Sequence, residues 1–354
     1  MNEKIAITHA RVFDGSQLSE PRTVVIDGPV IGSDSDSARV LDADGAVLLP
    51  GLIDAHVHLH DHEALSQLAT AGVTTGLEMG AWSPGSVASL RNQPGVADMR
   101  SAGIPAIGPG GMHAKQLGFP EEAVVTSGAD FVAARVAQDA DYIKIVLEGP
   151  GDGGPTPETA HAVVEAARAA GKLVIAHATT PGAYQLGLEI GVDIITHAPN
   201  GDELADEVVQ RLVADGRSVV PTLVMMEAMT ASFGRPDRFA AALSNVAAMY
   251  EAGVPIIAGS DSHPPLPDSR IDVAYGTSLH YELELLVRAG LSTVDALRAA
   301  TSLPAKHFGL SDRGAVQPGL RADLVLINGD PIADIRATRQ VVRVWCAGVE
   351  HKLD

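Results

Sequence analysis

The chain has 354 residues, of which 46% are hydrophobic and 19% charged, a composition that fits a globular protein with one large core. Its 44 acidic and 25 basic residues give a net charge of −19, which disfavours binding to nucleic acid or to an anionic membrane surface. The sequence contains no apolar run of transmembrane length and no signal-peptide core, and its single cysteine, Cys346, excludes an internal disulfide. We therefore expect a cytoplasmic protein that acts on a small molecule, has no nucleic-acid or membrane partner, and assembles as a homo-oligomer.

The two ends of the chain alternate apolar and polar residues between turn signals, a pattern typical of antiparallel strands. It covers residues 3–49 and returns over 318–350. Because neither segment alone has enough strands to bury a core, we predict that both combine into one small β-sandwich. The predicted boundaries are 1–51 and 315–354 for the two parts of the sandwich, with a catalytic domain over 52–314.

Between these ends, short β-branched runs alternate with segments of helical period, as in repeated βα units around a parallel sheet. The helix predicted over 157–172 has Pro157 near its start and Gly171 near its end. Eight such units predict an α/β fold, a (β/α)8 TIM barrel, with functional side chains at the C-terminal ends of the strands. The predicted strands cover residues 52–58, 73–79, 104–108, 142–147, 173–178, 193–198, 218–223 and 255–261.

The first of these strands opens the segment PGLIDAHVHLHDH, residues 50–62, which places four histidines at alternate positions. Side chains two residues apart in a strand point to the same face, so His56 and His58 would point to a common site, as metal ligands do. An exposed polar stretch is the alternative, and the HxH pattern alone leaves both interpretations open.

Other polar residues stand at corresponding places in later strands: Lys144, His177, His197 and Asp261. Any one of them alone is more often a hydrogen-bonded core residue or a helix cap. Their joint occurrence at strand ends favours a site that binds zinc or a similar divalent metal, for which imidazole and carboxylate are suitable ligands. Lys144 does not fit this set, because an ammonium has no acceptor for a cation and is costly among apolar residues.

Several segments together resemble the amidohydrolase superfamily over nearly the whole chain, in the branch with a two-metal centre that includes prolidases and imidazolonepropionases. The segments are PGLIDAHVHLH, AGVTTGLEMG, DYIKI, IAHA, ITHAP, IAGSD and GAVQPGLRADLVLINGDP. Their combination is far more specific than any one motif.

The resemblance implies that Lys144 reacts with carbon dioxide to form a carbamate that bridges two divalent ions. Zinc is favoured, with manganese, cobalt or iron as alternatives. A bridging hydroxide would attack the substrate, and Asp261 would serve as general base and acid. The expected reaction is hydrolysis of an amide, as in a dipeptide, an N-acyl amino acid or a cyclic amide. The implied ligands are His56, His58 and Asp261 for one ion and His177 and His197 for the other.

His113 lies in the Gly-rich segment GPGGMHAKQLGF and is our candidate electrophile, because a histidine in a similar loop of prolidase-like relatives contacts the substrate carbonyl. An exposed loop histidine is an equally weighted alternative. For Lys115 a surface charge is favoured over a contact with a substrate carboxylate, whereas Glu78 is expected to orient a ligand histidine.

The remaining histidines and one tyrosine have weaker claims. We expect His60 and His62 to lie in a loop or at a helix start, because the resemblance assigns only His56 and His58 as ligands. A structural role is favoured over a place in the substrate pocket for Tyr184, His263 and His280.

Other functions compete with the amidase. A lactonase, an esterase or a phosphotriesterase would use the same two-metal centre. A mononuclear deaminase is less favoured, because HATTPGAY has no acidic residue soon after His177 and because Lys144 is present. A scaffold without activity is also less favoured, since the complete ligand set is present.

Overall fold

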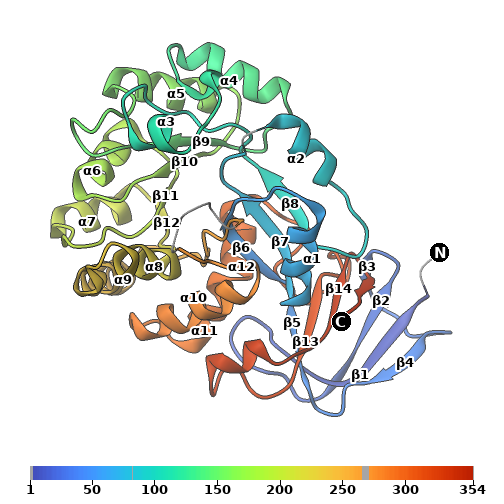
Figure 1. Cartoon of the computed structure of the whole chain (residues 1–354). Helices are drawn as coiled ribbons and strands as arrows, with labels where there is room; N and C mark the ends of the chain where they lie inside the picture. Colours follow the sequence, from blue (N-terminus) through green and yellow to red (C-terminus); the bar gives the residue numbers. More distant parts are fainter. Residues whose placement is uncertain (1–2, 82, 265–270, 354) are drawn as a thin grey trace.

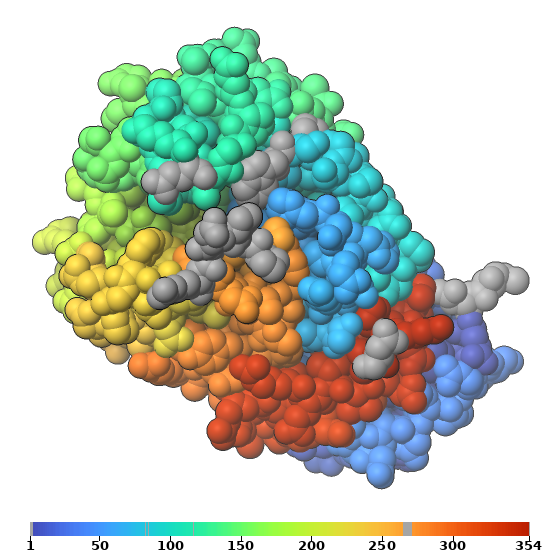
Figure 2. All heavy atoms as spheres, viewed as in Figure 1, coloured from blue at the N-terminus to red at the C-terminus, as the bar shows by residue number. Residues whose placement is uncertain are grey.

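The computed structural model of the chain describes residues 3–81, 83–264 and 271–353 and has two parts (Figure 1). One part is an arc of strands with helices on its outside, and the other is a sheet built from both chain ends. Figure 2 shows the first and last segments, in blue and red, side by side at one end of the molecule. Within the described residues, no helix combines the length and the apolar character needed to cross a membrane.

The terminal strands form one eight-stranded sheet in the order β15-β14-β13-β5-β1-β2-β3, with β4 also paired to β1. The expectation that both ends combine is therefore confirmed, but they form a single sheet where two stacked sheets were predicted. The reason lies in β1, which pairs with β2 and β4 and also with β5, shifting its register near His9, where φ is +54°. The strands are β1 (Ile5–Val12), β2 (Arg22–Asp27), β3 (Val30–Gly32), β4 (Arg39–Asp42), β5 (Val47–Pro50), β13 (Leu324–Ile327), β14 (Val341–Cys346) and β15 (Val349–His351).

The strands of the middle region are parallel and alternate with helices, as the sequence predicted. They form two separate sheets, β12-β11-β10-β9 and β6-β7-β8, and isolated β-bridges link these sheets to the segments beside them. Among the described residues, the strands therefore do not close into a continuous barrel. Their bounds are β6 (Leu52–Val57), β7 (Val73–Glu78), β8 (Asp98–Ser101), β9 (Ile143–Val146), β10 (Val174–His177), β11 (Ile194–Thr196) and β12 (Ser218–Val220).

Two of the eight predicted strands are wrong. The third strand is β8, and residues 104–108 make single bridges instead, because Pro105 has no N–H to donate to a ladder. Residues 255–261 likewise make one bridge at Ile256, and Pro255 limits the ladder there for the same reason. Both segments nevertheless run beside their expected neighbours: Ala106 bonds to Lys144, and Ala55 to Ala258.

The helices follow the local signals of the sequence. The Thr156 side chain caps α5 by accepting from the N–H of Thr159, Pro157 opens the helix, and Gly171 follows its end with φ +67°. The helices are α1 (His62–Thr70), α2 (Pro84–Leu90), α3 (Met112–Gln116), α4 (Gly128–Ala137), α5 (Pro157–Ala169), α6 (Pro181–Ile190), α7 (Asp206–Ala214), α8 (Leu223–Ser232), α9 (Phe239–Ala252), α10 (Thr277–Arg288), α11 (Thr293–Ala299) and α12 (Ser302–His307).

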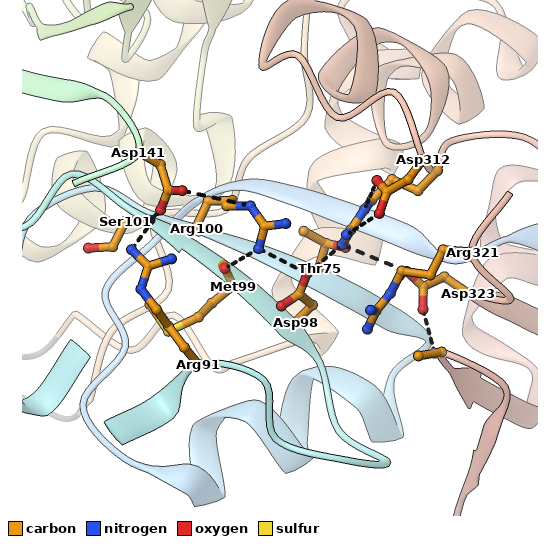
Figure 3. Close-up of polar contacts among 12 residues, drawn as sticks. Thr75, Arg91, Asp98, Met99, Arg100, Ser101, Asp141, Asp312, Arg321 and Asp323 are labelled. Carbon is orange, nitrogen blue, oxygen red and sulfur yellow. Dashed lines mark hydrogen bonds and ion pairs between the residues drawn. The ribbon is translucent and has the colours of Figure 1, made fainter. Parts of the chain in front are cut away.

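An ion network with a buried centre joins β7 and β8 to the chain segment that leads into the terminal sheet (Figure 3). At its centre Arg313 donates from Nη1 to Asp98, at 2.8 Å, and to Thr75, at 2.9 Å. Asp312 accepts from the same guanidinium, at 2.8 and 3.0 Å. Burial alone would lower the pKa of Arg313, but the surrounding carboxylates raise it, so the charge is retained. We call this group the Arg313 network: Thr75, Asp98, Arg100, Asp312, Arg313, Arg321 and Asp323.

Candidate metal centre

Two histidines and one aspartate meet at the C-terminal end of β6. His56 is in the strand and His58 follows its last residue; the Nε2 atoms lie 3.3 and 3.1 Å from Oδ1 of Asp261. The three residues each offer a ligand atom within 4.8 Å of the others, which is close enough to hold one metal ion. The alternate spacing in the sequence thus brings both histidines to one site.

Two more predicted ligands continue this group. Nδ1 of His197 lies 3.7 Å from Oδ2 of Asp261, and its ring centroid is 4.9 Å from that of His56. The ring of His177, at the end of β10, is 4.3 Å from the ring of His197. We call the predicted ligand set the metal-centre cluster: His56, His58, Lys144, His177, His197 and Asp261.

Lys144 is buried on β9, which pairs with β10. Its Nζ donates to Oγ1 of Thr196, at 2.9 Å, and it makes no ion pair within the described part of the chain. Burial lowers the pKa of Lys144 to about 7, while the more distant charges of Asp261 and Glu78 oppose this shift. An amine with a pKa of about 7 is partly unprotonated at neutral pH, and the unprotonated amine is the form that can react with carbon dioxide.

Burial favours the neutral form of three imidazoles of the cluster, and the neutral form is the one that binds metals. Burial lowers the pKa of His56 and His177 well below the ordinary value, and that of His197 to about 3. His58 is the exception: burial would lower its pKa, but the hydrogen bond and charge of Asp261 raise it. Burial would raise the pKa of Asp261, but its contacts with His58 and His197 lower it.

Three residues in and beside the cluster have a left-handed backbone conformation. His197 has φ +77°, Asp261 +60° and Thr222 +47°, although none is glycine. Such conformations are uncommon for residues with a Cβ and gather at functional sites. All three lie at or beyond the C-terminal end of a strand or of a strand-like segment.

The donor set fits a divalent metal centre. The Nε2 atoms of His56 and His58 both face the Asp261 carboxylate, and the side chain of His56 is buried. Buried imidazole nitrogens and one carboxylate are typical of zinc and related ions, which bind nitrogen and oxygen ligands.

The candidate electrophile, His113, lies beside the cluster. It was predicted in a loop, but it is on the short helix α3 and is buried, with its ring centroid 4.7 Å from that of His177. Glu148, which follows β9, accepts from the N–H of Met112 and contacts Nδ1 of His113, both at 3.1 Å. Sequence reasoning missed Glu148; its place four residues after Lys144 is the only signal.

Two glycine-rich loops, 108–111 and 153–154, pack against each other near His113 and Glu148. The N–H of Gly110 bonds to the carbonyl of Gly153 at 3.0 Å. A Cβ on Gly108 would lie 2.0 Å from the carbonyl carbon of Gly154, and one on Gly111 would lie 2.5 Å from Glu148 Oε1. Only glycine permits this approach, so the loop that carries His113 and the loop that carries Glu148 fit together as one unit.

Other buried groups support the cluster without belonging to it. Asp54, also missed by sequence reasoning, accepts from the N–H of His56 and from the N–H and hydroxyl of Ser260, which ties β6 to the segment that carries Asp261. The carboxylate of Glu78, at the end of β7, bonds to Gly80 N–H and lies 4.0 Å from Nδ1 of His58.

The weaker sequence candidates differ in where they lie relative to the cluster. Tyr184 is buried in α6 and donates to the carbonyl of His197 at 2.6 Å, so it holds the backbone of His197 in place. His280 is buried between Ala71 O and Thr338 Oγ1, outside the cluster. The others lie as follows: His62 begins α1 and His60 precedes it, both exposed; Lys115 is exposed on α3; and His263 contacts the carbonyl of Pro264.

Solved structures and a sequence relative with a similar architecture are known. A solved Xaa-Pro dipeptidase, with methionine bound in its active site, superposes with a TM-score of 0.85 over 99% of this chain and 100% of that chain, at 24% identity. A putative prolidase from Bifidobacterium longum gives 0.84 over 98% and 94%, at 26% identity. Adenine deaminase 2 of Rhizobium meliloti is 30% identical over 329 residues, which cover 86% of this chain and 49% of the deaminase.

The sequence pattern of the amidohydrolase family matches residues 47–350. This match covers the metal-centre cluster and nearly all of the chain. The chain therefore belongs to the amidohydrolase family.

Proposed function

We propose that this protein hydrolyses an amide bond at a two-metal centre. The observation that carries the proposal is the position of Lys144, buried without an ion-pair partner in the described residues and beside a strand that ends in a cluster histidine. As a carbamate, Lys144 would become an anionic ligand and would no longer be a costly buried amine.

The ligands divide into two groups. His56, His58 and Asp261 would hold one ion, and His177 and His197 the other, with the Lys144 carbamate shared by both. Zinc is the favoured ion because the donors are imidazole nitrogens and carboxylate oxygens. Bound divalent ions would lower the pKa of a water molecule and polarise the substrate carbonyl.

Asp261 would carry the proton. Its carboxylate accepts the proton released when water forms the new C–O bond, and returns it to the nitrogen as the C–N bond breaks. The side chain is 12% exposed, so a reacting group has access to it, and its lowered pKa keeps it ready to accept. The products are a carboxylic acid and an amine.

His113 would hold the substrate carbonyl from the side of His177. The glycine loops and Glu148 fix its ring, so little ordering is needed when the substrate binds. Dipeptides and N-acyl amino acids are the favoured substrates, a choice supported by the likeness to a dipeptidase and a putative prolidase.

Hydrolytic deamination of a base is the second candidate, favoured by the identity to an adenine deaminase. It also breaks a C–N bond by attack of water. The absence of an acidic residue soon after His177 weighs against it, as does Lys144. Lactones and other esters are further alternatives for the same centre.

The test is a substrate screen with zinc or manganese, using dipeptides, N-acyl amino acids, cyclic amides, adenine and lactones. We expect turnover of a dipeptide or N-acyl amino acid, together with about two ions per chain in metal analysis of protein purified without chelator. Release of ammonia from adenine by a protein that binds one ion would contradict the proposal, and turnover of lactones alone would replace amidase by lactonase.

A further inference from the structure

Helix α8 is capped by a side chain from another helix. The first N–H groups of a helix have no partner within it, and a local side chain usually supplies one. Here Glu282 of α10 accepts from Leu223 N–H at 3.0 Å with Oε1 and from Val224 N–H at 2.8 Å with Oε2. Glu282 is completely buried, and this bidentate contact spans 58 residues of sequence.

The local residue does not cap the helix. Thr222 stands at the cap position of α8, yet its side chain makes no capping bond, and its backbone is left-handed, with φ +47° and ψ +48°. This conformation is strained for a β-branched residue. It allows Oγ1 of Thr222 to lie 2.8 Å from Nδ1 of His197.

This contact would decide which ring nitrogen His197 presents to a metal ion. With Nδ1 engaged by Thr222, Nε2 is the ring nitrogen left for a ligand bond. The carbonyl of His197 is held as well, by the hydroxyl of Tyr184 at 2.6 Å. His197 is thus fixed at both its backbone and its ring.

We propose that Glu282 is a positioning residue for His197: it takes over the capping of α8 and so leaves the Thr222 hydroxyl free to orient the imidazole. The inference rests on the proposed metal centre, in which His197 holds the second ion. A residue with no contact to the cluster would then set the affinity of one ion.

The experiment measures the affinity of both ions for the full-length protein, by competition between zinc and a chromophoric chelator. Thr222→Val keeps the shape of the side chain and removes the hydroxyl, and Glu282→Gln keeps the shape but places an amide against one of the two N–H groups. We expect each variant to weaken one ion by about 10–100-fold and to leave the other unchanged. Thr222→Ser, which keeps the hydroxyl, should bind both ions as the wild type does.

Two controls separate this role from a purely structural one. Ser292→Ala removes the cap of α11, which supplies no residue to the cluster, and should lower Tm without changing either ion. The double variant Thr222→Val/Glu282→Gln should bind no more weakly than the weaker single variant, because both changes act on one contact.

The outcomes can be told apart. Wild-type affinity for both ions in folded Glu282→Gln would overturn the positioning role while leaving the metal centre intact. Additive losses in the double variant would also overturn it, since Glu282 would then act by a route other than Thr222. A wild-type protein that binds fewer than two ions would contradict the two-metal centre itself, and the role of Glu282 with it.

Discussion

The metal-centre cluster and the Arg313 network are both polar and have buried residues at their centres, yet their charges are balanced in opposite ways. In the network, Arg313 and Arg321 face Asp98, Asp312 and Asp323, so each charge has a partner within the chain. In the cluster, four imidazoles and a lysine are accompanied by one carboxylate, and Lys144 makes no ion pair within the described residues. The charges of the network are paired within the chain, whereas the cluster offers a set of donor groups suited to a metal ion.

Their places along the strands match this difference. The network includes Asp98, the first residue of β8, whereas the cluster histidines stand at or just beyond the ends of β6, β10 and β11. In barrels built from βα units, the C-terminal ends of the strands serve chemistry and the opposite ends serve stability. Changes in the two groups should therefore have different consequences.

The largest effect is expected at Lys144. Lys144→Ala removes the proposed bridge, so both ions should be lost and kcat/KM should fall by about 10⁴-fold or more, because the catalytic unit fails as a whole. Metal analysis and steady-state kinetics measure both losses. A short carboxylic acid added with metal should restore part of the activity.

The matched control is Lys172→Ala. Lys172 bonds to the carbonyl of Ala140, away from the cluster, so its loss should leave metal content unchanged. Full activity in Lys144→Ala would remove the bridging role of Lys144 from the proposal.

Asp261→Asn should rank next. The amide cannot accept a proton, so kcat should fall by about 10²–10⁴-fold while much of the metal is retained. The pair of measurements is kcat and metal content on the same preparation. A variant with unchanged kcat would assign the proton transfer to another group.

Arg313→Met tests the other side of the comparison. It removes the closest cation of the buried Asp98 and leaves Asp323 with Arg321 alone, so the free energy of unfolding should fall by about 3–5 kcal/mol. Urea unfolding measures this loss. The folded fraction should keep its metal and its kcat/KM, and a selective loss of metal would show that the two groups are coupled.

His280 gives the smallest expected effect and sharpens the comparison, because it is a buried histidine with protein partners on both ring nitrogens. Burial lowers its pKa to about 4. The unfolded chain, with an ordinary pKa near 6.5, binds the proton first as pH falls. The stability from His280 is therefore fully present above pH 6.5 and is lost between pH 6.5 and 4.

The measurement is the free energy of unfolding across this range, for the wild type and for His280→Gln, in which the amide can replace both hydrogen bonds. The variant should show a shallower slope, with a difference of at most about 3 kcal/mol over the window. Equal slopes would contradict the assignment of this titration to His280.

Sequence reasoning reached the family and the parallel strand–helix alternation, because both rest on local patterns. The alternation of His56 and His58 and the apolar runs around Lys144 can be read within a few residues. The strand prediction at 104–108 was wrong. The apolar residues of this segment favour a strand, but Pro105 has no N–H and interrupts a ladder.

The residues that support the site could not be predicted from local sequence patterns. Glu282 reads as an ordinary acidic residue of an amphipathic helix, and only the packing of α10 on α8 brings it to Leu223. Thr222 was predicted to lie in a strand, whereas it stands beyond the end of β12 with a left-handed backbone. Glu148 has only one local signal, its place four residues after Lys144, because its partner His113 is 35 residues away in sequence.

The interlocked glycine loops carry a consequence for engineering. Substrate range in this fold is commonly altered by exchanging one loop at a time, since loops tolerate change better than the strands that carry them. Here the loop that bears His113 and the loop that bears Glu148 meet backbone to backbone at Gly108, Gly110 and Gly153. A graft of either loop alone would collide with the other, so the two must be transplanted as a pair.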